Sequence, residues 1–377
     1  MKYSKLTIVF IIVAILAVGF FIVKHKAKNS DTINVGAIFS STGVAGDYGK
    51  KSVEGVVLAT ELINSRGGIN GKKINLFVED AKSSNKDAIS AYQKLVDYNG
   101  VHYIIGDVYS STTKVVIENL SKDVVLFAPG ASNPDLVNIS ENFLRNWTSD
   151  DFDGFAMSKI IQEHRITTIS VLTQQNDYTM ALMNAFVKDY KTEGRIVSDE
   201  GLFTEDQKSF RELLMNLKRK DVKAIYLIGM SKQVGQILKE SKEIGFMPQW
   251  FTNLTVNTED CKQIAGSAIN GVIFSEPFVD RTSDNWKEFY DEYKVKFNKE
   301  PDTTSAHSFD ALNILALAFN NTNYHNIEEV TKYINNLHDY QGVSGNTTFD
   351  GKGGVLKDIE VLQFQNDVPV RIKIFRF

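Results

Sequence analysis

The chain has 377 residues, about two and a half times a typical domain length, and this predicts two domains. Apolar residues make up 43% of it, and the glycine and proline counts are too low for a collagen-like or low-complexity protein. The formal net charge of −4 argues against a nucleic-acid-binding protein, which usually carries a basic excess. A single cysteine, Cys261, excludes an internal disulfide framework and a cysteine-based metal site.

Residues 1–31 form a separate N-terminal element. The run 6–23 is almost entirely apolar and has lysines on both sides. As a helix it would rise about 27 Å, close to the ~30 Å hydrocarbon core of a bilayer. We therefore expect an N-terminal transmembrane signal anchor. A cleaved signal peptide, which usually has a shorter apolar region and a small-residue cleavage site, remains the alternative.

From residue 32 onward, short apolar runs alternate with amphipathic stretches. The pattern predicts strands at 33–39, 73–79, 102–107 and 124–128, and helices at 52–65, 85–99 and 111–120. A strand–helix–strand order of this kind is typical of a parallel sheet covered by helices.

The same alternation restarts after residue 168. Strands are expected at 169–173, 196–203, 224–229, 250–252 and 271–275, and helices at 178–193, 210–218, 231–244, 284–297 and 305–320. Two strand-like segments, 358–365 and 370–377, end the chain. The order predicts an α/β protein of two doubly wound parallel-sheet lobes, with more than one chain crossing between them.

Most enzymatic signatures are absent from the sequence. The glycine-rich stretch 67–73 lacks the spacing of a phosphate-binding loop and follows a helix, so we interpret it as a turn. The six histidines have no metal-ligand spacing, and we interpret His307 as structural. Cys261 follows two acidic residues that would raise a thiol pKa, so it is interpreted as an unreactive side chain. We expect no enzyme activity, no metal and no cofactor.

Two loops that follow predicted strands carry hydroxyl groups. In 106–113, Ser110 and three further hydroxyl residues open a helix, where free backbone N–H groups and the positive helix end favour an anion. A plain helix N-cap is the alternative. In 128–134, Gly130 permits close backbone approach and Ser132 adds a hydroxyl. Because open α/β sheets bind ligands beyond the carboxyl ends of their strands, the two loops together could hold one carboxylate.

These residues, in this order, resemble the Leu/Ile/Val-binding-protein-like family of type I periplasmic, ABC-transporter substrate-binding proteins. The matching segments are 36–49, Gly55, Ala59, 63–74, Asp80, 105–113 and 129–133, with looser matches at 176–178, 235–238, 308–312, 342–345 and 349–350. The resemblance covers roughly residues 32–377.

The resemblance implies two lobes joined by a three-crossing hinge, with the ligand in the cleft. Lobe 1 would comprise 32–150 plus about 279–355, and lobe 2 would comprise 151–278 plus about 356–377. It also implies roles for side chains. Ser110 and Ser132 would bind the ligand carboxylate, the Gly130 carbonyl would accept from an amino group, and Tyr48, Tyr109, Ala131 and Tyr178 would wall the pocket.

Two positions depart from the family pattern. Leu254 stands where amino-acid binders often have a carboxylate for the ligand ammonium, and Met230 stands where an aromatic residue is common. A buried ammonium without a counter-charge is costly. Either Asp107, Glu276 or Asp310 replaces the missing charge, or the ligand is a carboxylate or amide without an amino group.

The function implied is a non-enzymatic solute receptor outside the cytoplasmic membrane. Lobe closure would capture a small carboxylate-bearing ligand, an amino acid or a related compound, and present it to an ABC permease. The receptor would be periplasmic or on the extracellular face, tethered to the membrane through the N-terminal helix, or secreted if that helix is cleaved. A ligand sensor that signals to a regulatory partner is the alternative. An α/β enzyme would need a general base or nucleophile that the sequence does not offer, and no nucleic-acid partner is expected.

Overall fold

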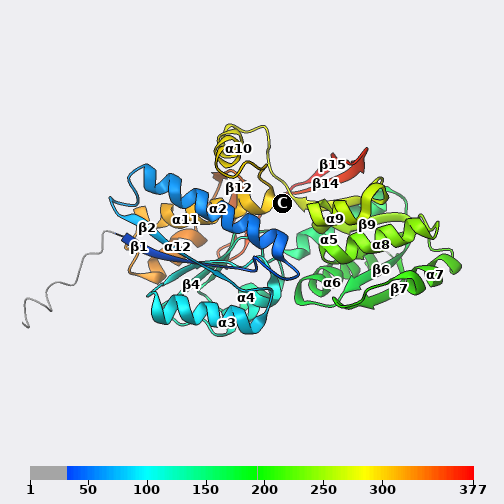
Figure 1. Ribbon diagram of the computed structural model, residues 1–377, viewed down its shortest axis with the longest axis horizontal. Helices are drawn as coiled ribbons and strands as arrows, with labels where there is room; N and C mark the ends of the chain where they lie inside the picture. The colour runs from blue at the N-terminus through cyan, green and yellow to red at the C-terminus, as the bar shows by residue number, and fades with distance from the viewer. Residues whose placement is uncertain (1–31, 193) are drawn as a thin grey trace, which may run out of the picture.

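The computed structural model describes residues 32–192 and 194–377, which form two α/β lobes lying side by side (Figure 1). The expected N-terminal signal anchor falls outside these residues. Within the described ranges, no helix combines the length and the apolar character needed to cross a membrane.

The first lobe is built on a parallel sheet with strand order β2-β1-β3-β4-β5. Its strands are β1 (Thr32–Phe39), β2 (Lys73–Asp80), β3 (Tyr103–Ile105), β4 (Val125–Ala128) and β5 (Phe143–Arg145). Its helices are α2 (Gly46–Ser65), α3 (Asn85–Gln93), α4 (Ser110–Glu118), α10 (Asp284–Phe297), α11 (Thr303–Asn321) and α12 (Ile327–Asn335). A small sheet of β11 (Tyr340–Gly342), β12 (Gly345–Phe349) and β13 (Val355–Leu356) completes the lobe.

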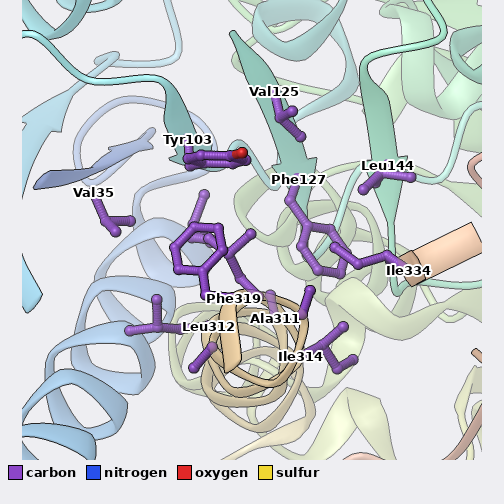
Figure 2. Close-up of a cluster of buried hydrophobic side chains, with 14 of the residues drawn as sticks. Val35, Tyr103, Val125, Phe127, Leu144, Ala311, Leu312, Ile314, Phe319 and Ile334 are labelled. Atoms are coloured by element: carbon purple, nitrogen blue, oxygen red, sulfur yellow. The ribbon is translucent and has the colours of Figure 1, made fainter. Parts of the chain in front are cut away.

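Helix α11 supplies much of the core of this lobe. Its side chains Leu312 and Phe319 belong to the same buried cluster as Tyr103 and Phe127 of the sheet (Figure 2). The Phe319 and Tyr103 rings lie edge to face, with centroids 4.6 Å apart. Helix α2 packs closely on α11 because Gly55 faces the Ser305 carbonyl, and a Cβ at this position would lie 2.2 Å from that oxygen. The glycine therefore sets the distance between the two helices.

The second lobe is built on a sheet with strand order β15-β14-β10-β9-β8-β6-β7. Its strands are β6 (Thr168–Gln174), β7 (Ile196–Phe203), β8 (Ala224–Ile228), β9 (Gln249–Asn253), β10 (Ile273–Pro277), β14 (Ile359–Gln365) and β15 (Val368–Phe375). Its helices are α5 (Asp150–Glu163), α6 (Asp177–Lys191), α7 (Arg211–Arg219), α8 (Ser231–Glu243) and α9 (Glu259–Ala265). The chain passes between the lobes after β5, after β10 and after β13.

The sequence-based elements and the structure agree in order but differ in detail. The strand β15 pairs antiparallel with β14, which pairs antiparallel with β10, so the second sheet is mixed. The tight turn at Asn366 and Asp367, both with positive φ, allows this hairpin. The helices α5, α9 and α12 and the small sheet were not predicted, and α2 begins earlier than expected, at Gly46. The glycine-rich stretch near Ile69 is a turn, as predicted, closed by two backbone hydrogen bonds with Lys72.

The packing of α11 yields a first testable prediction. Phe319→Ala should lower the free energy of unfolding by about 3–5 kcal/mol, because it removes a buried ring and leaves a cavity. Urea unfolding measures this change. The matched surface variant Val295→Ala, at a position 85% exposed, should change it by less than about 0.5 kcal/mol. Equal effects of the two variants would contradict the assigned core.

Candidate functional site

A cavity of about 430 Å³ lies between the two lobes. Its walls come from loops and helix starts that follow strands of both sheets. They are lined by Ala45, Tyr48, Val108, Tyr109, Gly130, Ser132, Trp147, Tyr178, Met230, Leu254, Thr255 and Thr304. The carboxyl ends of the parallel strands in each lobe therefore face one cavity, as expected for ligand sites in open α/β sheets.

Six of the eight predicted site residues line this cavity: Tyr48, Tyr109, Gly130, Ser132, Tyr178 and Leu254. The other two, Ser110 and Ala131, are buried beside it. Ala131 is fully buried, and its carbonyl accepts a hydrogen bond from Arg145 Nη1 at 3.4 Å. The structure thus gathers the predicted residues in one region but does not place Ala131 in the cavity wall.

Side chains from both lobes meet across the cleft and close it. Ala45 and Tyr109 of the first lobe form one apolar cluster with Met230 of the second, and Tyr178 packs against it. Beside this cluster, Asn133 Nδ2 donates to the Asp177 carbonyl at 3.1 Å, and Lys114 lies 3.7 Å from the Asp177 carboxylate. These contacts join the lobes around the cavity.

The N-terminus of α4 is available to a ligand. Its N-cap residue is Tyr109, and none of the described side chains caps the helix. Thr112 and Thr113 use their hydroxyls locally, since both donate to the Tyr109 carbonyl at 2.9 Å. Ser110 Oγ is buried without a hydrogen-bond partner among the described residues. The first N–H groups of a helix have no intrahelical acceptor, so this end combines free donors with the positive end of the helix dipole.

The loop after β4 approaches the same region. Gly130 fits because a Cβ there would lie 2.7 Å from the Val108 side chain. Arg145, which is buried under this loop, donates from Nη1 to the Asn133 carbonyl at 2.9 Å. The loop is therefore held in a fixed position while Gly130 and Ser132 line the cavity.

Two tyrosines and two apolar residues shape the rest of the wall. Burial raises the pKa of Tyr48 and of Tyr178 well above the usual value, so both phenols are neutral hydrogen-bonding groups. Tyr178 OH lies 3.0 Å from Asn253 Nδ2 and accepts its hydrogen bond. Met230 and Leu254 line the cavity as well, so both positions expected to depart from the family pattern lie at the site.

A larger open cavity of about 1650 Å³ adjoins the inner one and shares Tyr48, Leu254 and Thr304 with it. Its rim is charged and includes Lys50, Glu259, Glu300 and Arg371 among its acidic and basic groups. The inner cavity therefore borders a space with a charged rim, and the three shared residues lie between the two.

The three acids considered as replacements for the charge missing at Leu254 are engaged elsewhere. Asp107 accepts hydrogen bonds from the Ser40 backbone N–H at 3.0 Å and from Thr112 Oγ1 at 2.6 Å. Glu276 pairs with Arg281 at 2.8 Å, and Asp310 accepts from the backbone N–H groups of 343 and 344. The carboxylate oxygens of these three residues are therefore bonded to loops or to an arginine within the fold.

Asp150 is a buried acid that the sequence analysis missed. It is the first residue of α5 and is 1% exposed, and its Oδ2 has no hydrogen-bond partner among the described residues. Its backbone N–H donates to the Ser132 carbonyl at 3.0 Å. Burial raises the pKa of Asp150 well above its usual value, and the Ser132 hydroxyl opposes part of this shift. The signal in the sequence was Ser149, which caps α5, followed by an acidic first turn.

Trp147 on the cavity wall rests on His307. The two rings lie 4.5 Å apart between centroids. His307 is buried, bonds the Thr303 carbonyl through Nδ1 at 2.7 Å, and has Lys357 Nζ 3.2 Å from Nε2. Burial holds the pKa of His307 well below its usual value and lowers that of Lys357 to about 8. His307 is therefore structural, as predicted.

Cys261 is fully buried, and burial raises the pKa of its thiol to about 12, in agreement with the prediction that it is unreactive. Among residues 32–192 and 194–377, no group of three or more His, Cys, Asp or Glu side chains could hold a metal ion.

Comparison with known proteins identifies the family. A family model described as periplasmic binding protein matches residues 32–367. The chain belongs to the periplasmic binding protein family. Its members bind substrates and are not enzymes, which confirms the predicted family and the predicted lack of enzyme activity.

Individual relatives of this periplasmic binding protein fit that assignment. The leucine-, isoleucine-, valine-, threonine-, and alanine-binding protein of Pseudomonas aeruginosa is 25% identical over 344 residues, covering 90% of this chain and 91% of the relative. The crystal structure of the substrate-binding protein LivJ of a branched-chain amino acid transporter from Streptococcus pneumoniae, in complex with isoleucine, is also similar. It has a TM-score of 0.85 and 25% identity, and the match covers 92% of this chain and 99% of LivJ.

A more distant structure shows the same fold. The solute-binding protein of an ABC transporter from R. palustris, in complex with benzoate, matches with a TM-score of 0.82 and 14% identity, covering 91% of this chain and 96% of that chain. In that protein, the fold holds a carboxylate that carries no amino group.

The contacts of Asp107 predict a structural role for this residue. Asp107→Ala should lower the free energy of unfolding by about 3 kcal/mol, because it leaves buried N–H and O–H groups without an acceptor. Urea unfolding measures the change. Asp123→Ala, at an exposed side chain beside His102, serves as the control and should shift it by less than about 0.5 kcal/mol. A stability unchanged by Asp107→Ala would contradict this role.

Proposed function

We propose that this chain is an extracytoplasmic solute receptor that captures a small carboxylate-bearing ligand between its lobes and delivers it to an ABC permease. The ligand is an amino acid or a related compound. The observation that supports this most strongly is the uncapped N-terminus of α4, with the unpartnered Ser110 hydroxyl, beside the cavity between the lobes. A ligand carboxylate would satisfy these donors.

The site residues form two groups, one that binds the charged end of the ligand and one that surrounds its apolar portion. Ser110, Ser132 and the N–H groups at the start of α4 bind the carboxylate, and the Gly130 carbonyl accepts from an amino group where the ligand has one. The remaining wall of Tyr48, Tyr109, Tyr178 and Leu254 surrounds an apolar portion of the ligand, and Ala131 supports the loop from behind. Affinity then comes from desolvated charge-assisted hydrogen bonds together with burial of apolar surface.

Lobe closure is the proposed capture step. The lobes comprise 32–150 plus about 279–355, and 151–278 plus about 356–377, and they rotate about the three crossing segments. The strand membership of the two sheets supports these boundaries. The contacts of Asp177 with Lys114 and Asn133 join the lobes in the closed form and are broken when the cleft opens.

The place of action follows from the family and from the N-terminal segment. The family is named for periplasmic binding proteins, and one similar structure is the substrate-binding protein of a branched-chain amino acid transporter, which supports delivery to a permease in the membrane. The apolar run 6–23 with its flanking lysines supports tethering to the cytoplasmic membrane as an uncleaved anchor. The binding lobes would then lie on the outer face, within reach of the permease.

The carboxylate site is tested by the double variant Ser110→Ala/Ser132→Ala. It should weaken binding of a carboxylate ligand by about 100-fold, because two hydroxyl donors to a buried charge are lost. Isothermal titration calorimetry with L-leucine and 4-methylpentanoate measures this. The control Ser65→Ala removes an exposed hydroxyl at the end of α2, away from the cavity, and it should leave affinity unchanged. A folded double variant with unaltered affinity would contradict the site assignment.

A further inference from the structure

The first two turns of α11 contact all three segments that cross between the lobes. His307 packs its ring on Trp147, which lies in the first crossing between β5 and α5, with centroids 4.5 Å apart. Thr303 Oγ1 accepts a hydrogen bond at 3.3 Å from Arg281 Nη2 of the second crossing, between β10 and α10. Lys357 of the third crossing, between β13 and β14, places Nζ 3.2 Å from His307 Nε2. The start of this helix therefore joins the three segments on which the lobes rotate.

The ammonium group of Lys357 is buried and has three acceptors. The residue is 3% exposed. Its Nζ donates to the Ser344 carbonyl at 3.0 Å and to Ser344 Oγ at 2.8 Å, and His307 Nε2 is the third acceptor. Ser344 Oγ donates in turn to Asp310 Oδ2 at 2.5 Å. A charged lysine has three N–H donors and satisfies all three acceptors, whereas the neutral amine leaves one of them without a donor.

The hydrogen bonds of His307 fix its tautomer and the orientation of its ring. Its Nδ1 lies 2.7 Å from the Thr303 carbonyl and carries the proton, because a carbonyl oxygen only accepts. Its Nε2 is then the acceptor that faces Lys357. Burial, together with the charge of Lys357, holds the pKa of His307 well below its usual value, so the ring stays neutral. Trp147 therefore packs on a ring that is held at both nitrogens.

We propose that His307 is a positioning residue that couples the cavity wall to the hinge, because it supports Trp147 while Lys357 of the third crossing holds its ring. Trp147 is buried and lines the inner cavity, so a turn of the His307 ring moves one wall of the ligand site. The structural role of His307 is thus to support that wall. The coupling is a property of the fold, and only its effect on affinity rests on the proposed receptor function.

The titration of Lys357 distinguishes such coupling from a passive packing contact. Burial lowers the pKa of Lys357 to about 8, and the Asp310 carboxylate opposes part of this shift. When Lys357 loses its proton, its longest hydrogen bond, the one to His307, is the first to lose its donor. The surroundings of Trp147 should therefore change as the pH rises through about 8.

The other titratable groups around Lys357 are known. Helix α11 contributes His307, which stays neutral, and Asp310, which is bonded to the Ser344 hydroxyl. Strand β11 contributes Tyr340 near Asp310, and burial raises the pKa of this phenol far above its usual value. Asp358, the next residue in the chain, is bonded by residues 376 and 377. A variant at position 357 separates the titration of the lysine from that of Asp310.

The coupling is measured without ligand by fluorine NMR of the full chain labelled with 5-fluorotryptophan. The chain has three tryptophans, so the spectrum has three signals, which are assigned with Trp250→Phe and Trp286→Phe. Between about pH 6.5 and 9.5, the Trp147 signal should shift with a midpoint of about 8. The signals of Trp250 in β9 and Trp286 in α10 should not follow it. This measurement on the wild-type protein needs no variant of Lys357 or His307 to fold.

Two variants remove the pH-dependent shift in different ways. Lys357→Arg keeps a cation with N–H donors but does not titrate in this range, so the shift should disappear. His307→Phe keeps a ring beside Trp147 but has no acceptor for Lys357, so the shift should disappear here as well. Lys352→Met, at an exposed lysine just before β13, is the control and should leave the shift unchanged. Circular dichroism checks that the variants fold.

The effect on the ligand site is measured by calorimetry with L-leucine and 4-methylpentanoate. His307→Gln removes the ring under Trp147 and should weaken both probes by about 10-fold, because it disturbs a wall of the cavity from behind. The two probes should be affected equally, since His307 itself does not line the cavity.

The outcomes separate the coupling from the receptor function. A Trp147 signal that does not shift in the wild-type protein would overturn the coupling. A shift that survives Lys357→Arg would assign it to another buried group, such as Asp150 or Asp310, and would overturn it too. Unchanged affinity in a folded His307→Gln variant would overturn the positioning role. Wild-type binding of neither probe would count against the receptor function, and the fluorine signals would still decide the coupling.

Discussion

The structure depends on one constraint: the carboxyl ends of two sheets face each other across a narrow space. Each strand that ends there delivers a loop or helix start to the same cavity, so Tyr109, Gly130, Tyr178 and Leu254 meet although they are far apart in the chain. The uncapped N-terminus of α4 provides the hydrogen-bond donors at that cavity. Free N–H donors and a helix dipole in a water-poor site favour a single bound anion.

Most buried carboxylates of the protein are held by hydrogen-bond donors or cations within the fold. Asp107 and Asp310 are surrounded by donors from loops, and Glu360 is held between Arg281 and Arg371 at 2.7 and 2.6 Å. These groups stabilise the fold because their oxygens are satisfied. Asp150 has the same degree of burial, but its Oδ2 has no hydrogen-bond partner among the described residues.

The order of most strands and helices could be predicted because most strands of these sheets are short apolar runs and most helices have one apolar face. The helix α5 was missed, because its start, with Asp150, Asp151 and Asp153, has the composition of an exposed polar loop. The antiparallel direction of β14 against β10 depends on the path of the chain through the hinge, and β15 follows β14 through the tight turn at Asn366 and Asp367.

The site could be predicted to the level of loops and not to the level of contacts. Ser132 and Gly130 were identified because ligand loops follow parallel strands. That Ala131 turns away toward Arg145, and that Asp150 Oδ2 has no hydrogen-bond partner among the described residues, are consequences of tertiary packing. The sequence places an acidic residue at position 150, but burial and hydrogen bonding decide which acids are free.

The central claim is that the cavity between the lobes binds a carboxylate ligand. Thermal unfolding of the purified protein against a panel of amino acids, amino-free carboxylates and amides tests it most directly. A ligand at 100 times its dissociation constant adds about 2.7 kcal/mol of stability, which raises the unfolding temperature by several degrees in a protein of this size. The account predicts such a shift with carboxylates and none with the matching amides. Equal shifts for carboxylates and amides, or no shift with any carboxylate, would contradict it.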